Sequence, residues 1–274
     1  MGPQFSLAHL TVLGTTPLEL IDIAAEAGYD YASVRTTPVT PGEPVTPLAN
    51  DPAMARQVVR RLADTGLQIL DVELARLGPD DEPDQFLPVF EVAAAVGARH
   101  VIGQLADPDR SRAADRFGRL CHLAAGFGLT VELEFPSWTQ VGDLNTAAGI
   151  VAAVDRANAG ILVDALHFFR SGSSLDVLGS LPRRWFRFVQ LCDAPASTPS
   201  TVEEVIHTAR FARSLPGYGG LPLPALLDRL PDVPYSLEVP NDVLRREVGT
   251  AEFARLVLAV ARTLVAGNDQ SAVA

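Results

Sequence analysis

Residues 160–167 read GILVDALH, a strand-like run that ends on Asp164, with His167 three residues further on. The same arrangement, an apolar run closed by one oxygen-bearing side chain, occurs three more times: Glu134 in VELEF (131–135), Gln190 in FRFVQLCDAP (186–195) and Glu238 in YSLEVPND (235–242). The runs lie roughly 25 to 50 residues apart, the separation that a strand, a helix and the next parallel strand require. The pattern therefore predicts parallel strands whose polar ends lie on one face.

Strand-like and helix-like segments alternate along the whole chain. Predicted strands cover Phe5–His9, Tyr31–Arg35, Gln68–Glu73, His100–Gln104, Thr130–Glu134, Gly160–Asp164, Phe186–Gln190 and Tyr235–Glu238. Predicted amphipathic helices include Thr16–Ala27, Pro52–Thr65 and Asp115–Phe127, and Gly28, Gly66, Gly97 and Gly128 are expected to end helices. Because such barrels typically run to about 250 residues, the alternation predicts a single (β/α)8 TIM barrel over residues 1–266. The remaining residues, 267–274, are expected to form a disordered tail.

An open, doubly wound sheet is the alternative architecture for the same alternation. The first predicted strand is not followed by G-x-G-x-x-G, so a dinucleotide-binding fold has little support. Two long connections, Thr36–Asn50 and Ala194–Gly220, follow the second and seventh predicted strands. In a barrel both would lie on the face where the strand ends converge, either as lids or as plain surface connections.

Composition excludes several classes of function. The net charge of −11 repels phosphate backbones and anionic membrane surfaces, so we expect neither nucleic acid nor a membrane as a partner. All 22 basic residues are arginine, so no lysine side chain is present to form a Schiff base. Two cysteines, Cys121 and Cys192, do not make a disulfide framework. Because no apolar run reaches the ~18 residues of a membrane span and the N-terminus lacks a signal-peptide pattern, we expect a cytoplasmic protein.

Glu134, Asp164, Gln190 and Glu238 together predict one metal site, because strand ends converge at one face of a barrel. The alternative is that each residue merely caps the helix that follows it. Three carboxylates and one amide form an all-oxygen set, which suits one Mn²⁺ or Mg²⁺ ion, with Co²⁺ also compatible, better than Zn²⁺. Such an ion would bind a substrate through adjacent carbonyl and hydroxyl oxygens and stabilise the enolate formed by deprotonation of a neighbouring carbon.

His167 is the first candidate for proton transfer, since its offset from Asp164 lets the imidazole reach a substrate without binding the ion. A structural role is the alternative. His9, at the end of the first predicted strand, is a weaker candidate for the pocket. Arginines gather at predicted strand exits and their loops: Arg35, Arg76, Arg210 and Arg213. Guanidinium groups bind carboxylate or phosphate in a bidentate manner, so an anionic substrate is expected if one or two point inward; solvated surface charge is the alternative.

At these residues the chain resembles the xylose-isomerase-like TIM-barrel superfamily of sugar phosphate isomerases and epimerases. The resemblance covers nearly the whole chain, with the most specific motifs between Glu134 and Asp242. The D-x-x-H pattern of Asp164 and His167 looks like the superfamily's sixth-strand ligand and substrate-contacting histidine. Glu134 and Glu238 look like the paired glutamates of its ketose epimerases, which implies that both bind metal and exchange protons.

Gln190 departs from that pattern, because the superfamily commonly has histidine as the seventh-strand ligand. The runs VQLCDAP (189–195), RSLPGYG (213–219) and SLEVPND (236–242), together with Trp138, are similar to 3-dehydroshikimate dehydratases of the same superfamily. That resemblance implies His167 as the base and Arg213 as a substrate contact. The third-strand signature of this branch is replaced by DVELARL (71–77), which leaves Arg76 as its counterpart.

Two related reactions therefore fit the sequence. The first hypothesis is a divalent-metal-dependent isomerase or epimerase that abstracts a proton next to a carbonyl on a small polyhydroxylated, anionic substrate. The alternative is a dehydratase, a carbon–oxygen lyase of the 3-dehydroshikimate type, which uses the same metal site and expels a β-hydroxyl. Two glutamates favour reprotonation, whereas Gln190 and the arginines favour elimination.

Two other classes of protein fit less well. A noncatalytic binding protein is opposed by the mutual repulsion that unused carboxylates would suffer. An endonuclease IV-like DNA repair enzyme needs a histidine-rich multi-zinc site, and the chain has five scattered histidines and a net negative charge. We expect a small molecule as the partner, and the sequence leaves a homo-oligomer open.

Overall fold

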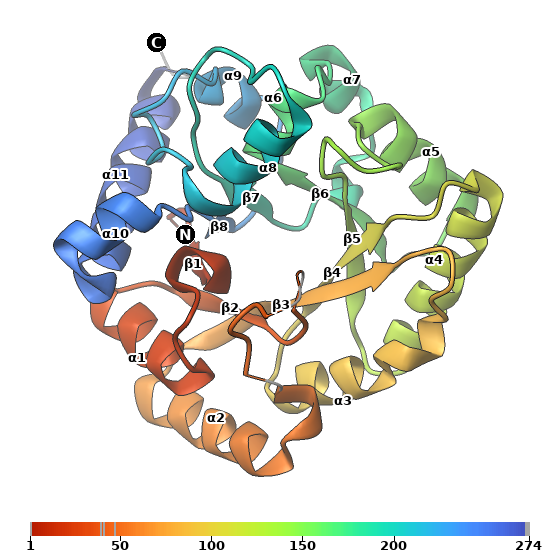
Figure 1. Cartoon of the computed structure of the whole chain (residues 1–274), viewed down its shortest axis with the longest axis horizontal. Coiled ribbons are helices and arrows are strands. Elements are labelled where there is room, and N and C mark those ends of the chain that lie inside the picture. The colour runs from red at the N-terminus through yellow and green to blue at the C-terminus, as the bar shows by residue number, and fades with distance from the viewer. Residues whose placement is uncertain (1, 39, 41, 47, 272–274) are drawn as a thin grey trace.

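Eight parallel strands form one closed barrel in sequence order, in which each strand pairs with the next and β8 pairs with β1 (Figure 1). The computed structural model describes residues 2–38, 40, 42–46 and 48–271. The strands are β1 (Phe5–Ala8), β2 (Tyr31–Arg35), β3 (Gln68–Leu77), β4 (His100–Leu105), β5 (Thr130–Glu134), β6 (Ala159–Asp164), β7 (Val189–Leu191) and β8 (Tyr235–Leu237). The predicted fold class, a single TIM barrel, is confirmed.

Helices surround the barrel, and the hydrophobic core fills the space between the two layers (Figure 1). The α-helices are α1 (Pro17–Ala27), α2 (Pro52–Thr65), α3 (Leu87–Ala95), α4 (Arg110–Ala125), α5 (Leu144–Val154), α6 (Ala165–Arg170), α7 (Leu175–Ser180), α8 (Val202–Phe211), α9 (Leu223–Leu227), α10 (Asp242–Val248) and α11 (Thr250–Ser271). Short 3-10 helices are η1 (His9–Val12), η2 (Leu48–Asn50), η3 (Pro83–Phe86) and η4 (Arg183–Trp185). None of the helices in the described ranges is both long and apolar enough to span a membrane.

Local sequence explains where the first helix begins and ends. Thr16 and Glu19 form a capping box, in which the Thr16 hydroxyl accepts from the Glu19 N–H at 3.2 Å and the Glu19 carboxylate accepts from the Thr16 N–H at 2.7 Å. At the other end Gly28 has φ of 88°, a left-handed conformation that glycine adopts at little cost. Helix α1 therefore begins one residue later than predicted, with Thr16 as its cap.

Several boundaries differ from the prediction. Strand β3 continues beyond Glu73 to Leu77, because its pairing with β4 resumes after a register shift between Glu73 and Ala75 and reaches the pair Leu77 and Leu105. Arg76 therefore lies within a strand. Strand β7 begins only at Val189, after the 3-10 turn η4. Helix α11 runs through Gly267 to Ser271, where a disordered tail was expected, and 272–274 lie outside the described residues.

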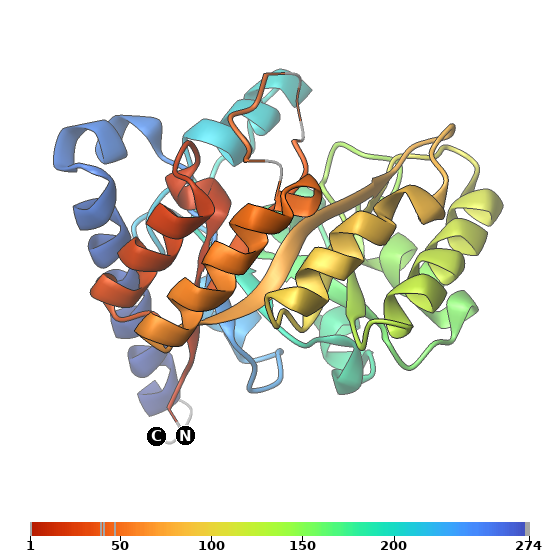
Figure 2. The same cartoon turned by 90° about the horizontal axis from the view of Figure 1, so that it is seen from below.

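Strand register brings the predicted site residues to the same end of the barrel. Asp164 of β6 pairs with Gln190 of β7, and Gln190 pairs with Ser236 of β8, two residues before Glu238. Two segments project from one side of the barrel: the connection after β2, and helix α8 (Figure 2). Both belong to the segments that were expected to be long loops. The C-terminal strand ends and these two segments together form the surroundings of the site.

Candidate active site

A cavity of about 220 Å³ lies between the strand ends, the connection after β2 and helix α8. Its lining includes most of the residues singled out from the sequence: Glu134, His167, Gln190, Glu238, Arg35, Arg76, Arg210 and Arg213. Asp164 is buried next to it and contacts both His167 and Arg213. Eight of these nine residues thus face one small space, and the ninth supports two of them.

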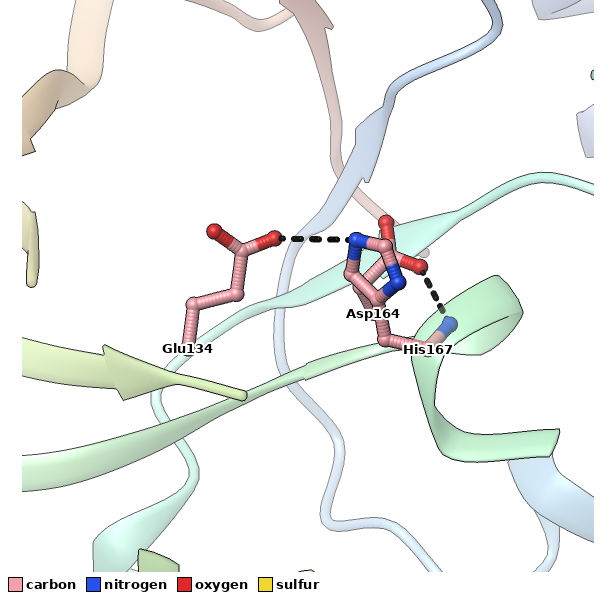
Figure 3. A group of neighbouring side chains, drawn as sticks. All are labelled: Glu134, Asp164 and His167. Atoms are coloured by element: carbon pink, nitrogen blue, oxygen red, sulfur yellow. Dashed lines mark hydrogen bonds and ion pairs between the residues drawn. The ribbon is translucent and has the colours of Figure 1, made fainter. Parts of the chain in front are cut away.

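Glu134, Asp164 and His167 meet at the edge of this cavity (Figure 3). One ligand atom from each lies within 4.8 Å of the others, close enough for the three to hold a metal ion. The His167 Nε2 atom is 3.8 Å from the Glu134 carboxylate, and the His167 backbone N–H donates to Asp164 Oδ1 at 3.0 Å. Asp164 is thus the N-cap of α6, and capping leaves its second oxygen available to other partners.

Gln190 and Glu238 adjoin this group through hydrogen bonds. The Gln190 amide donates to Glu238 Oε1 at 3.0 Å. Its carbonyl oxygen is buried and has no hydrogen-bond partner among the described residues. A buried acceptor of this kind needs a partner. Together with the three carboxylates, the Gln190 carbonyl oxygen forms an all-oxygen set of ligands that fits a hard divalent cation.

Arg213 joins Asp164 to Glu238. Its Nη1 atom lies 2.5 Å from Asp164 Oδ2, and its Nη2 atom lies 2.7 Å from Glu238 Oε2. The side chain is only 2 % exposed, although it borders the cavity. Arg213, expected as a substrate contact, thus lies within the carboxylate cluster, and the substrate contact stays a prediction.

Gln104 is a site residue that sequence reasoning missed. Its amide donates to Glu134 Oε2 at 2.5 Å, and its carbonyl oxygen accepts from Arg76 Nε at 2.9 Å and from Arg76 Nη2 at 2.6 Å. Gln104 stands near the end of the apolar run HVIGQL (100–105), so the strand-exit pattern used for the other four residues could have found it. It orients one oxygen of Glu134 and leaves the other toward His167.

Arg35 is held by two acidic residues that were also missed. Its guanidinium lies 2.7 Å from Glu73 of β3 and 2.7 Å from Glu43 in the connection after β2. These ion pairs attach the connection to the barrel beside the cavity. Glu73 ends the predicted strand Gln68–Glu73, so it carried the same strand-exit signal, whereas Glu43 lies in a proline-rich segment without such a signal.

His9 and Arg210 have different surroundings. The His9 Nε2 atom bonds to the Thr15 carbonyl oxygen at 3.0 Å, and its Nδ1 atom accepts from the Arg35 backbone N–H at 3.2 Å. Both ring nitrogens are therefore engaged behind the cavity, and His9 is not among the described lining residues. Arg210 borders the cavity from α8. Burial lowers the pKa of Arg210, and it also lowers the pKa of Arg76, which lines the same cavity.

Burial dominates the electrostatics of the catalytic candidates. It raises the pKa of Glu134 to about 7, and the nearby Asp164 carboxylate adds to this shift. Burial also lowers the pKa of His167 to about 4, so the imidazole is neutral at physiological pH. Although burial alone would raise it, the pKa of Asp164 is lowered because the Arg213 guanidinium lies beside it and the His167 backbone N–H donates to it. Burial raises the pKa of Glu238 well above its usual value, and Arg213 only partly opposes this shift.

Trp138 fixes the orientation of His167. The two rings meet edge to face, with centroids 4.9 Å apart and an interplanar angle of 82°. Trp138 also lines the cavity, four residues beyond Glu134. An aromatic wall on this side holds the imidazole with its Nε2 atom toward Glu134.

Asp71 lies deeper in the barrel and is fully buried. One of its carboxylate oxygens accepts from the Ser33 hydroxyl at 2.5 Å, and the other has no partner among the described residues. Burial, followed by repulsion from Glu73, raises the pKa of Asp71 well above its usual value. The folded protein therefore keeps a proton on Asp71 at pH values where the unfolded chain has lost it.

This shift predicts the effect of Asp71→Asn on stability. Because the pKa is raised on folding, Asp71 lowers the stability of the wild type as pH rises above about 4, the pKa of an unfolded aspartate. Asparagine removes this penalty, so we expect the Tm of the variant to exceed that of the wild type by about 3 °C or more at pH 8, with a smaller difference at pH 5. Thermal unfolding at both pH values measures this, and a difference that stays constant or shrinks toward pH 8 would contradict it.

Comparison with known proteins places most of the chain in one family. A family model described as xylose isomerase-like TIM barrel matches residues 21–258. An inosose isomerase of Bacillus velezensis is 24% identical over 248 residues, which cover 86% of this chain and 84% of that protein.

Three solved structures share the fold. A xylose isomerase-like TIM barrel/4-hydroxyphenylpyruvate dioxygenase fusion protein matches with a TM-score of 0.79 and 23% identity over 94% of this chain, which spans only 42% of the fusion protein. The IOLI protein with a bound zinc atom matches with a TM-score of 0.77 and 20% identity, over 95% of this chain and 96% of that one. The probable 3-DHS dehydratase AsbF of Bacillus anthracis matches with a TM-score of 0.73 and 15% identity, over 94% and 98% of the two chains.

Proposed function

We propose that this chain, which belongs to the xylose isomerase-like TIM barrel family, is a divalent-metal-dependent isomerase or epimerase of a small polyhydroxylated, anionic substrate. The observation that carries the proposal is the meeting of Glu134, Asp164 and His167 within 4.8 Å beside a small cavity. The relatives, an inosose isomerase among them, mark the chain as an enzyme of the isomerase and epimerase type.

The metal would be held by Glu134, Asp164, Gln190 and Glu238. The unpartnered carbonyl oxygen of Gln190 supports its inclusion, since a buried acceptor gains from a cationic partner. Hard oxygen ligands favour Mn²⁺ or Mg²⁺, with Co²⁺ also compatible. When bound, such an ion polarises a substrate carbonyl and stabilises negative charge on its oxygen.

Glu134 and Glu238 would exchange protons with the carbon next to the carbonyl. Burial raises the pKa of Glu134 to about 7 when no ion is bound, and a bound cation would lower it, so that Glu134 would be an ionised base at neutral pH. Its Oε2 atom is held by Gln104, so Oε1 is the oxygen that accepts the proton. Glu238 directly follows β8, which is three strands away from β5 around the barrel, and would return a proton from another side.

His167 would accept a proton or a hydrogen bond from the substrate hydroxyl next to the reacting carbon. Its neutral imidazole can accept a proton at Nε2, and Trp138 holds the ring in place. A hydrogen bond at Nε2 keeps a substrate hydroxyl aligned while its neighbouring carbon is deprotonated.

The anionic group of the substrate would lie beside Arg76 and Arg210. Both line the cavity, and their mutual proximity contributes to the lowered pKa of Arg76, so an anion between them would relieve repulsion. A cavity of about 220 Å³ suits a small molecule rather than a polymer. Arg35 borders the same space and is paired with Glu43 and Glu73, and Arg76 is bonded to Gln104.

A dehydratase of the 3-dehydroshikimate type is the second candidate. Gln190 in the seventh-strand ligand position and the arginines around the cavity favour it, because elimination from a keto acid needs a site for the carboxylate. His167 would then take the proton from carbon and pass it to the leaving hydroxyl, which would depart as water, so that no proton returns to carbon. The two reactions share every proposed ligand and differ in whether a carbon–oxygen bond breaks.

Metal analysis and reloading test the proposed cofactor. Protein purified without chelator is expected to carry about one Mn²⁺, Mg²⁺ or Co²⁺ per chain, lose activity with EDTA and regain it with one of these ions. Assays should include ketoses, inososes and 3-dehydroshikimate, with the product identified by NMR. Full turnover in the presence of excess chelator, with no metal detected, would end the proposal.

A further inference from the structure

Arg213 occupies an unusual position for an arginine near a cation site. Its guanidinium bridges two of the four proposed metal ligands, at 2.5 Å from Asp164 Oδ2 and 2.7 Å from Glu238 Oε2. Its side chain is almost completely buried, so solvent does not screen these pairs. The Arg213 guanidinium therefore places a positive charge within the carboxylate cluster.

The contacts of Arg213 leave little of it for a substrate. Nε donates to the Ala209 carbonyl oxygen at 2.8 Å, and Nη1 contacts Cys192 Sγ at 3.2 Å in addition to Asp164. Together with the bond to Glu238, these contacts use four of the five N–H donors that a guanidinium has, so a substrate could take only one.

The backbone of Arg213 is fixed as firmly as its side chain. The Arg213 N–H donates to the Pro240 carbonyl oxygen at 3.0 Å, and the Asn241 side chain donates to the Arg213 carbonyl oxygen at 2.8 Å. These bonds join the end of α8 to the segment that follows β8. The position of the guanidinium is therefore set by the fold and does not depend on a bound ligand.

Charge balance suggests that the guanidinium and a metal ion share the site. Ionised Glu134, Asp164 and Glu238 carry three negative charges, whereas Arg213 carries one positive charge. A divalent ion would bring the cluster to neutrality, since His167 and Gln190 are uncharged. Without the arginine, the same cluster would retain one excess negative charge when the ion is bound. Uncompensated buried charges are strongly destabilising.

We propose that Arg213 is a resident cation of the metal site, with two effects. It holds the Asp164 and Glu238 carboxylates together before the ion binds, and its charge lowers the affinity of the site for the ion. Arg213 is thus a positioning residue that acts through these two carboxylates. The inference rests on the proposed function, because it assumes that these carboxylates bind a divalent ion.

The test is Arg213→Met, which keeps an unbranched side chain and removes the charge. Mn²⁺ is titrated into metal-free wild type and variant by calorimetry, and thermal unfolding is followed with and without Mn²⁺. We expect the variant to bind Mn²⁺ about tenfold more tightly or better, because a cation next to the ligands has been removed. We expect its Tm without metal to fall by about 6 °C or more, since a buried ion-pair partner is lost, and Mn²⁺ to restore most of the loss.

Arg213→Lys is the matched control, because it keeps the charge but cannot bridge both carboxylates with a planar fork. It should bind Mn²⁺ with nearly wild-type affinity while losing stability without metal. If Arg213→Met does not fold without metal, Arg213→Gln replaces it in the titration. Purely structural damage would weaken Mn²⁺ binding in the uncharged variants and would not tighten it.

The outcomes separate this inference from the proposed function. If the wild type binds Mn²⁺ and the uncharged variant binds it equally or less tightly, the inference is wrong and the proposed metal dependence stands. If only the uncharged variant binds Mn²⁺, the inference holds and the proposed metal dependence of the wild type fails. If neither binds Mn²⁺, both fail.

Discussion

Replacing Glu238 by alanine is expected to abolish metal binding and to lower turnover by roughly 10³-fold or more, within the range for loss of a catalytic acid or base. Two contributions are lost together. The carboxylate is a proposed ligand that accepts from Gln190 at 3.0 Å and pairs with Arg213 at 2.7 Å, and it is also a proposed proton carrier. Its removal leaves the buried guanidinium of Arg213 without one of its two carboxylate partners.

Metal content by mass spectrometry and steady-state kinetics measure these effects. The control is Glu247→Ala, the same change at an exposed position in α10, which should keep both the ion and the activity. A Glu238→Ala protein that retains its metal and turns over at the wild-type rate would remove Glu238 from the site.

His167→Ala is expected to keep the metal ion but to lose roughly 10²-fold or more in turnover, the range for removal of a general acid or base. His167 touches Glu134 and packs against Trp138, yet the proposed oxygen ligand set is complete without it. The loss should fall mainly on kcat, because proton transfer rather than substrate binding is impaired. His122→Ala, at an exposed position in α4, is the matched control.

His167 also lies within the group of three residues that could hold a metal ion, so the experiment has a second use. Loss of the ion together with activity would make His167 a ligand, and full activity would make it structural. Measuring metal content and rate on the same preparation distinguishes the two.

The fold could be predicted almost completely from local patterns. The apolar run GILV (160–163) lies in β6 because parallel strands buried on both faces favour continuous apolar sequence. Pro52–Thr65 is a helix over its whole predicted length, since Asp51 caps its start and Gly66 follows its end. Predicted boundaries were wrong where pairing between strands decides them. Strand β3 extends to Leu77 because β4 pairs with it that far.

The site could be predicted less completely. A polar residue after an apolar run marks a strand exit, and this signal covered Glu134 and Asp164 but was not applied to Gln104. The pairing of Arg213 with Asp164 could not be foreseen, because it depends on the path of the chain from α8 across to the segment after β8. Similarly, the Arg35 and Glu43 pair depends on how the connection after β2 folds back.

The central claim is that this barrel deprotonates a carbon next to a carbonyl and returns a proton to it. The direct measurement is NMR of the metal-loaded enzyme in D₂O with ketoses, inososes and 3-dehydroshikimate. We expect deuterium to appear at that carbon in an isomerised or epimerised product, and Glu134→Gln to remove the incorporation. An unsaturated product from 3-dehydroshikimate, without isomerisation of any other substrate, would select the dehydratase instead. No deuterium in any substrate and no product, from folded protein with its metal in place, would contradict the claim.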